Sequence, residues 1–474
     1  MRENVRKVKR KRVEKTQMNK KRSAFSGKIG YVLSAAGASV GLGNIWRFPY
    51  LAAKYGGGIF LLVYIILALT FGYTMIVAES ALGRMTRKSP VGAFRSFAKG
   101  KKVGWLSFGG WINAIIPVLI VPYYSVIGGW VVKYLFEYIR GNGSKLAEDG
   151  YFSGFISNGG ATEICFVIFC MFTLVIIYAG VQNGIERVSK IMMPILVVLS
   201  VIIAIYSVTR PGAIEGVKYF LVPNVKNFSW MTVVAAMGQM FYSLSIAMGI
   251  LVTFGSYMRK DTSIEDSTRN VEIFDTAIAM MAGLMIIPAV FAFSGGDPDT
   301  LQAGPSLMFI TIPKVFANMG FGTAVGILFF VLVLFAAVTS SIALTESAVS
   351  TFEDELGWGR KKATVLTGVI MIALGTLSCL GYGPLDFVKI IGMQFLDFFD
   401  FLTNSVMMPI AALMTSLLVS RVIGVDKIEE EIRHGESAFR RKKIFVIMIK
   451  YLCPIFALII LASSVANAFG WISM

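Results

Sequence analysis

The chain has 474 residues, of which 55% are hydrophobic, and its mean hydropathy is +0.69. This length and composition describe a polytopic membrane protein and exclude a series of soluble domains. The cysteines lie in apolar runs without metal-ligand spacing, and the one histidine, His434, lies in a charged stretch, so there is almost no material for a disulfide framework, a zinc site or histidine-based catalysis.

The first 22 residues are polar and dense in Lys and Arg. Because they contain no apolar run, we expect residues 1–22 to be a disordered basic tail in the cytoplasm that contacts anionic lipid. A signal peptide is the alternative interpretation of this basic start. The apolar run from Ile29 continues far beyond the length of a signal sequence, and many apolar segments follow it, which disfavours that alternative.

Eleven apolar segments follow the tail, and together they predict an all-α membrane protein with eleven transmembrane helices. The third segment is longer than a bilayer of about 30 Å requires, so we expect it to tilt or to project from the membrane. The segments are 27–54, 58–83, 104–139, 162–180, 188–208, 230–257, 274–294, 320–351, 362–379, 386–420 and 444–470.

The distribution of basic residues predicts the orientation of the chain. With the N-terminus inside, most Lys and Arg fall in loops on the cytoplasmic side, including 84–103 and 421–443. The opposite loops are sparse in them, which agrees with the positive-inside rule. Eleven spans then leave the C-terminus outside. The formal net charge of +17 is thus largely a topology signal, and we expect no nucleic-acid partner.

The first apolar segment contains a stretch, Ser34–Tyr50, that is a poor continuous helix. Its sequence is S-A-A-G-A-S-V-G-L-G-N-I-W-R-F-P-Y, and each glycine in a helix interior costs about 1 kcal/mol relative to alanine. Backbone that leaves the helix at membrane depth must be buried in protein or line a wet cavity. Small-residue packing is the alternative, but Asn44 and the costly charge of Arg47 favour an ion or substrate site.

A second interruption is expected in the sixth segment, at Gly238–Gly249, where small and hydroxyl residues again fill an apolar stretch. Spans one and six are the first members of two five-span halves. Broken helices at matching positions of two halves indicate the central site of an inverted-repeat transporter. The predicted divisions are a first repeat at 23–208, an extracellular loop at 209–229, a second repeat at 230–420, a cytoplasmic loop at 421–443 and an eleventh span at 444–474.

Oxygen-bearing side chains accompany both breaks. Asn44 follows the first break, Ser243 and Ser245 lie in the second, and Asp275 lies at the start of the seventh predicted span. Hard oxygen ligands of this kind suit a hard cation. In the eighth span the run Val338–Ser341 interrupts a very apolar stretch. Hydrogen bonds from these hydroxyls to carbonyls one turn earlier are the alternative explanation there, but together with the two breaks a cation site is favoured.

Charges near the ends of the spans form two further candidate pairs. Arg47 and Asp400 lie toward the outer side and could close an external vestibule, while Arg22 and Asp354 lie toward the cytoplasm. An ordinary interfacial charge is the alternative for the inner pair, and the preferred one for Asp354 alone. Tyr124, midway along the third span, could hold a carboxylate or could simply be buried with its hydroxyl satisfied.

The sequence resembles the neurotransmitter:sodium symporter family, and particularly its eleven-span bacterial amino-acid transporters, such as those of leucine, tryptophan and tyrosine. The resemblance covers residues from about 22 to the C-terminus. It rests on V-G-L-G-N-I-W-R-F-P-Y (40–50), G-G-G (56–58), A-E-S-A-L-G-R (78–84), P-Y-Y (122–124), G-Q-x-F-Y-S-L-S (238–245), V-T-S-S-I-A (338–343) and F-E-D-E-L (352–356). It implies a leucine-transporter-like fold of two inverted five-helix repeats.

The resemblance also implies a set of site residues and two sodium ions per substrate. Sodium site one would use Ser39, Asn44, Ser243 and Asp275, and sodium site two would use Gly37, Val40, Ala336, Thr339 and Ser340. Arg47 with Asp400 would form the outer gate, and Arg22 with Asp354 the inner one. The substrate would contact Ala38, Ser39, Leu42, Gly43, Ile120, Tyr124, Tyr242, Ser243, Ser245, Ala247, Met248, Ser340 and Leu344.

The implied function is sodium-coupled import of an L-amino acid across the cell membrane, without enzymatic chemistry. Monoamine transporters of the family carry an aspartate at the position of Gly41, so a substrate here should bring its own carboxylate. The apolar pocket favours a hydrophobic or aromatic side chain, and the carboxylate of Asp275 implies independence of chloride. A proton-coupled or exchanging transporter and a non-transporting sensor of the same fold are the alternatives.

Overall fold

The structure is a computed structural model that describes residues 23–98, 104–295 and 304–471. The basic tail and Arg22 therefore lie outside the described residues. Throughout the described ranges the regular structure is helical, with only two isolated β-bridges, Gly57 to Pro223 and Ile390 to Met393. The predicted all-α fold is confirmed.

Nine helical segments in the described part of the chain are long and apolar enough to cross a membrane. They are built from α4 (Gly58–Leu67) with α5 (Tyr73–Thr86), α7 (Ser107–Ile139), α10 (Gly159–Tyr178), α11 (Arg187–Val208), α15 (Ile264–Ser294), α17 (Gly322–Leu356), α18 (Arg360–Leu380), α19 (Phe395–Asp400) with α20 (Met408–Leu417), and α22 (Lys442–Ile447) with α23 (Cys453–Ala468).

Two further apolar stretches are each divided into two shorter helices. The first comprises α2 (Lys28–Ser39), the π-helical turn η1 (Gly43–Arg47) and α3 (Phe48–Lys54). The second comprises α13 (Trp230–Ser243) and α14 (Ile250–Tyr257). The nine continuous segments and these two broken ones are consistent with eleven spans, and the breaks lie in the two spans where the sequence predicts them. The limits of the two repeats stay predictions.

Two spans begin nine or ten residues away from the starts predicted from hydropathy. The seventh begins at Ile264 instead of residue 274, because Ser263 caps the helix by accepting a hydrogen bond from the Asp266 N–H. Charged residues fill the first turns of this helix and hide it from a hydropathy search. The tenth begins at Phe395 instead of residue 386, since the preceding residues form turns with a left-handed Gly392 (φ 78°).

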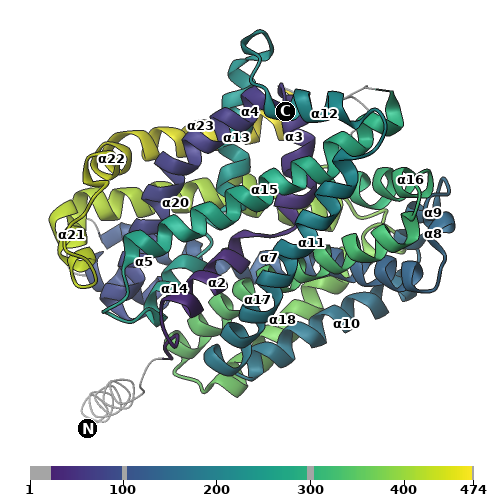
Figure 1. Ribbon diagram of the computed structural model, residues 1–474. Helices are drawn as coiled ribbons and strands as arrows, with labels where there is room; N and C mark the ends of the chain where they lie inside the picture. The colour runs from purple at the N-terminus through teal and green to yellow at the C-terminus, as the bar shows by residue number, and fades with distance from the viewer. Residues whose placement is uncertain (1–22, 99–103, 296–303, 472–474) are drawn as a thin grey trace.

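Short helices connect the spans. They are α6 (Pro90–Ala98), α8 (Gly143–Leu146), α9 (Tyr151–Ser157), α12 (Ala213–Leu221), α16 (Ile312–Ala317) and α21 (Val425–Arg433). The helix α2 lies in the middle of the bundle, where it packs against α11, α15 and α17 (Figure 1). Because α14 also contacts α2, the two broken spans meet at the centre of the molecule.

Candidate functional site

The first break is a short loop that is closed by its own residues. The helix α2 ends at Ser39, and Val40 leaves the helical region with ψ 91°. The Gly41 N–H donates to the Oδ1 atom of Asn44 over 3.2 Å, and the Asn44 N–H donates to the Gly41 carbonyl over 3.2 Å. The side chain of Asn44 therefore holds the backbone of the break in place.

The glycines of the first break are required by the closeness of neighbouring side chains. A Cβ atom on Gly41 would lie 2.8 Å from the Ser340 hydroxyl oxygen. One on Gly43 would lie 2.4 Å from the ring of Tyr242. Neither glycine has a positive φ. These positions therefore need glycine for space, so that helices from other parts of the chain can approach the backbone.

The second break, between α13 and α14, is longer and contains left-handed residues. Ser245 (φ 53°), Ala247 (φ 60°) and Gly249 (φ 70°) all have positive φ. The Ser245 hydroxyl donates to the Ala38 carbonyl over 2.9 Å, and the Ala247 N–H donates to the Oε1 atom of Glu79 over 2.8 Å. Side-chain and backbone partners on the first and second spans thus hold this loop.

A buried carboxylate joins the two breaks. Asp275 is fully buried and accepts hydrogen bonds from Asn44 Nδ2 (2.8 Å), the Ser243 hydroxyl (2.8 Å) and the Tyr64 hydroxyl (2.7 Å). Asn44 and Ser243 come from opposite breaks. The oxygens gathered here are hard ligands of the kind that a sodium ion would use, so the three residues predicted for sodium site one through their side chains are close enough to share an ion.

The two adjacent hydroxyls in the eighth span behave differently. The Thr339 hydroxyl donates to carbonyls of its own helix, those of Phe335 (3.0 Å) and Ala336 (3.2 Å). The Ser340 hydroxyl instead lies 3.2 Å from the Gly37 carbonyl oxygen and 3.4 Å from that of Val40. In this structure the hydroxyl of Thr339 is therefore satisfied by carbonyls of its own helix, whereas the hydroxyl of Ser340 faces the carbonyl oxygens at the end of α2.

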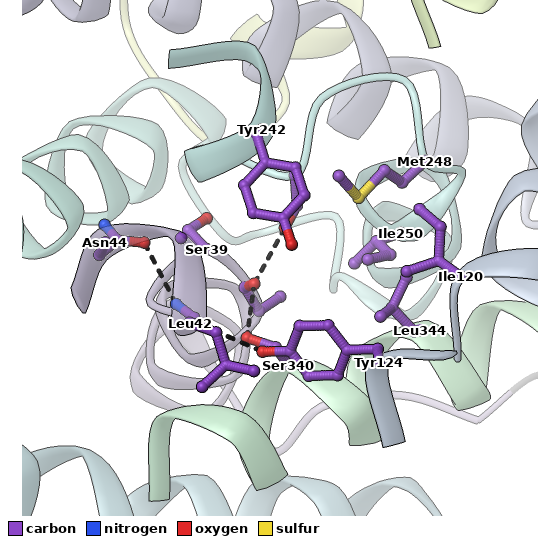
Figure 2. A pocket seen from close by; sticks show the side chains of 14 residues that line it. Ser39, Leu42, Asn44, Ile120, Tyr124, Tyr242, Met248, Ile250, Ser340 and Leu344 are labelled. Atoms are coloured by element: carbon purple, nitrogen blue, oxygen red, sulfur yellow. Dashed lines mark hydrogen bonds between the residues drawn. The ribbon is translucent and has the colours of Figure 1, made fainter. Parts of the chain in front are cut away.

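A pocket lies between the two breaks, and Tyr242 and Tyr124 point into it from opposite sides (Figure 2). The Leu42 N–H donates to the Tyr124 hydroxyl over 3.3 Å at its edge. The cavity has a volume of about 30 Å³, which is space for about two water molecules. Its lining residues are Ala38, Ser39, Gly41, Leu42, Gly43, Asn44, Ile120, Tyr124, Tyr242, Ser245, Met248, Ile250, Ser340 and Leu344.

Most of the residues predicted to contact the substrate line this pocket, and their role in binding stays a prediction. Two of the predicted set, Ser243 and Ala247, are absent from the lining because their polar contacts are directed to other spans. Three lining residues, Gly41, Asn44 and Ile250, were not predicted as substrate contacts. Ile250 follows the second break directly, and the irregular path of that loop conceals its position from any helical periodicity.

Among the described residues, the ion pairs within 4.0 Å do not include one between Arg47 and Asp400, the two residues of the proposed outer gate. Asp400 accepts hydrogen bonds from the Tyr123 hydroxyl (3.1 Å) and Asn404 Nδ2 (2.6 Å). The Arg47 guanidinium lies 5.6 Å from the centre of the Tyr242 ring. The arginine is thus next to the aromatic wall of the pocket, and the gate itself stays a prediction.

The inner gate stays a prediction as well, because Arg22 lies outside the described residues. Its proposed partner Asp354 accepts a hydrogen bond of 2.7 Å from the Ser89 N–H at the start of α6. This contact attaches the C-terminal end of the eighth span to the connection between spans two and three.

Three polar residues that support the site were not identified from the sequence as parts of it. They are Tyr64 beside Asp275, Glu79 beside the second break, and Gln239, whose Nε2 donates to the Gly43 carbonyl over 3.1 Å. Each is buried within an apolar span. A buried polar residue at membrane depth is costly unless it has a partner, and that cost is the signal that could have indicated them.

The family model described as "Sodium:neurotransmitter symporter family" matches residues 22–144 and 151–470. The chain is 36% identical to an uncharacterized sodium-dependent transporter, YhdH, of Bacillus subtilis, over 87% of this chain and 91% of that one. It is 32% identical to an uncharacterized sodium-dependent transporter of Haemophilus influenzae, over 95% and 99% of the two chains. The chain belongs to the sodium:neurotransmitter symporter family.

A solved structure agrees with this assignment. The crystal structure of MhsT in complex with L-phenylalanine is 36% identical in sequence and superimposes with a TM-score of 0.83, covering 94% of this chain and all of that one. The inverted-repeat fold predicted from the two breaks is therefore confirmed. The protein is a multi-pass membrane transporter of a sodium-dependent family and is not an enzyme.

Proposed function

We propose that this protein is a sodium-coupled importer of hydrophobic or aromatic L-amino acids that works by alternating access and does not require chloride. The observation that carries the proposal is the meeting of two helix breaks around one pocket, with Asp275 bridging Asn44 and Ser243 at its side. Unwound carbonyls and helix ends are suited to bind a cation, while exposed N–H groups suit a carboxylate.

The carboxylate of the substrate would bind at the edge of the first break. There the Leu42 N–H and the Tyr124 hydroxyl already face each other across 3.3 Å. A substrate carboxylate could accept hydrogen bonds from both groups. Gly41 brings no acidic side chain that could pair with an amine, which favours a substrate with its own carboxylate over a biogenic amine.

The side chain of the substrate would lie among Ile120, Met248, Ile250 and Leu344, which make one wall of the pocket apolar (Figure 2). L-Phenylalanine is bound in the related structure of MhsT, which supports a hydrophobic or aromatic substrate. Because the cavity is small, these side chains must move apart on binding. A flexible methionine such as Met248 makes that adjustment easier.

Two sodium ions would accompany each substrate. The first would bind beside Asp275, and the second between Ser340 and the carbonyls at the end of α2. Both positions connect a broken span to an intact one, so that ion binding would order the breaks. Coupling is reciprocal: the factor by which sodium raises substrate affinity must equal the factor by which substrate raises sodium affinity.

Sodium coupling is tested by uptake of radiolabelled L-phenylalanine and L-leucine into proteoliposomes that contain the full chain. We expect concentrative uptake with an inward sodium gradient and none when choline replaces sodium. Undiminished uptake in choline would show proton coupling or exchange, which a pH gradient then distinguishes. Substrate binding without concentrative uptake would indicate a sensor. Either result would overturn the proposal.

Chloride independence is tested in the same vesicles by replacing chloride with gluconate, which should leave uptake unchanged.

Because Asp275 supplies the negative charge beside the first proposed ion, Asp275→Asn should lower uptake at least about ten-fold, the equivalent of one lost charge-assisted interaction of about 1.4 kcal/mol. The matched control is Asp261→Asn, in an exposed ion pair with Arg259, and it should transport normally. Full activity of the Asp275 variant would contradict the assignment.

The substrate class is tested by a thermal-shift screen of the twenty amino acids in sodium buffer. We expect stabilisation by large apolar amino acids, since a ligand that binds only the folded state raises its stability in proportion to its affinity. Stabilisation by charged amino acids alone would contradict the apolar wall.

The proposed orientation, with the N-terminus in the cytoplasm and the C-terminus outside, follows from the positive-inside rule.

A further inference from the structure

The residues just before α2 contact a buried carboxylate on the fifth span. Glu186, at the end of the π-helical turn η4 (Val181–Glu186), is 2% exposed. It accepts a hydrogen bond of 2.9 Å from the Ser26 N–H and a second one from the Ser26 hydroxyl. The Lys190 ammonium lies 2.6 Å from the same carboxylate and 3.3 Å from the Ser26 hydroxyl. The carboxylate therefore joins the start of the first span to the fifth.

The fit of this carboxylate against α2 is close. A Cβ atom on Gly30 would lie 2.3 Å from the Oε1 atom of Glu186, so the first turn of the helix rests directly on the carboxyl group. A further bond of 2.7 Å runs from Gln182 Nε2 to the Ala24 carbonyl. The contact thus extends over residues on both sides of Ser26.

The same segment is held on its other side by the sixth span. The Phe25 N–H donates to the Tyr257 carbonyl over 3.0 Å, and the Phe25 ring packs edge-on against Phe254 and Tyr257. The beginning of α2 is therefore held between η4 and α14. The contact with η4 is made by the buried carboxylate of Glu186, which accepts hydrogen bonds from Ser26 and pairs with Lys190.

We infer that Glu186 is a gating residue that latches the cytoplasmic end of α2 in its closed position. The inference rests on the proposed sodium coupling and deepens it. The far end of α2 presents the Gly37 and Val40 carbonyls to Ser340, where the second sodium ion is proposed to bind. The latch and the ion therefore hold opposite ends of one helix, and both favour the same position of that helix.

This arrangement makes a quantitative demand on sodium affinity. If α2 must be in its closed position for the second ion to bind, the apparent sodium affinity is the intrinsic affinity multiplied by the fraction of molecules in which α2 is closed. Weakening the latch reduces that fraction and therefore lowers the apparent sodium affinity. The carboxylate would regain water when α2 moves away, and this hydration would lower the free-energy cost of releasing the latch. Glu186 would thus set how much sodium is needed to keep the cytoplasmic side closed.

The test is binding of radioactive sodium to the purified full-length protein, combined with hydrogen exchange of residues 28–39. We expect Glu186→Gln to weaken sodium binding about ten-fold, which corresponds to about 1.4 kcal/mol, and to speed exchange in α2. Ser26→Ala should shift both in the same direction by a smaller factor. Glu355→Gln, which removes a more exposed ion pair with Arg95, is the matched control and should behave as wild type.

Sodium affinity and α2 exchange that stay at wild-type values in both latch variants would overturn the inference. If Glu186→Gln speeds exchange throughout the protein, it has damaged the fold, and Ser26→Ala then decides, because that side chain is exposed and small. Absence of sodium binding in the wild type would refute the proposed function instead. In that case the exchange of α2 alone decides whether the latch exists.

Discussion

The two helix breaks perform the same task by different physical means. The first is three residues long, Val40–Leu42, and neither Gly41 within it nor Gly43 directly after it is in the left-handed region, although neighbouring side chains press against both. The second is six residues long, 244–249, and places two non-glycine residues, Ser245 and Ala247, in the left-handed region. A glycine-rich stretch is thus the less strained of the two.

The difference shows where each break obtains its stability. In the first, small residues allow Ser340 and Tyr242 to approach the backbone, so the loop is shaped by packing. In the second, left-handed backbone costs about 1–2 kcal/mol for each non-glycine residue. Hydrogen bonds to Ala38 and Glu79 offset that cost. The first break should therefore lose its shape when larger side chains replace its glycines. The second should lose its shape when its hydrogen-bond partners are removed.

Filling the first break should have the largest effect. In Gly43→Ala the new methyl group would meet the Tyr242 ring at 2.4 Å, and the ring forms one side of the pocket. We expect substrate uptake to fall by up to about 100-fold, since overpacking of a tight site costs about 1–3 kcal/mol and the new methyl group displaces a side chain of the pocket. Uptake into proteoliposomes measures the loss.

The control for this variant is Gly154→Ala in α9. Gly154 is exposed, its φ is not positive, and a Cβ atom there has nothing within 4 Å. It should leave uptake at the wild-type rate. If Gly43→Ala also transported normally, the closeness of Tyr242 to the first break would not be needed for function.

The sequence predicts the breaks well because both of their signals are local. Glycines, hydroxyls and a charge within an apolar run mark Ser34–Tyr50, and the same logic marks Gly238–Gly249. It also indicates Asn44, which directly follows the first break, and Asp275, which lies at the apolar start of the predicted seventh span although the helix itself begins earlier, at Ile264. The reason for each glycine could not be predicted in the same way. From the sequence, the glycines indicate a broken helix, and only the fold shows that Gly43 makes room for Tyr242.

The supporting partners could not be predicted because they are distant along the chain. Glu79 and Ala247 are 168 residues apart, and Tyr64 and Asp275 are 211 apart. The periodicity of a single span does not indicate which buried group on another span its polar residues will contact. The early start of the seventh span at Ile264 was missed for another reason, because charged residues, among them Glu265 and Asp266, fill its first turns and lower their hydropathy.

Removing a partner of the second break should have the next largest effect. In Glu79→Ala the buried Ala247 N–H loses its acceptor, which costs about 1–3 kcal/mol and leaves the left-handed residues unsupported. We expect a clear fall in the midpoint of thermal unfolding and a loss of uptake. Thermal unfolding of the purified protein in detergent, followed by an uptake assay, measures both.

Glu79→Gln is the matched control, because its amide oxygen can still accept the hydrogen bond from the Ala247 N–H. We expect it to retain most of the stability that the alanine variant loses. Equal destabilisation by both variants would mean that the negative charge, and not the acceptor, supports the break. An unchanged midpoint in the alanine variant would show that the second break holds its shape without Glu79.

The smallest expected effect comes from relieving backbone strain in the second break. Ala247 has φ 60° and is fully buried. Replacing it by glycine relieves about 1 kcal/mol of left-handed backbone strain, but it also removes one buried methyl group, which contributes about 0.8 kcal/mol to stability. The two terms nearly cancel, and Ala247→Gly should unfold close to the wild-type temperature. Ala36→Gly, in the helical part of α2, loses both the methyl group and about 1 kcal/mol of helix propensity, so it should be clearly less stable. If the two variants were equally destabilised, the left-handed geometry at Ala247 would carry no strain, and the contrast between a packed break and a strained one would fail.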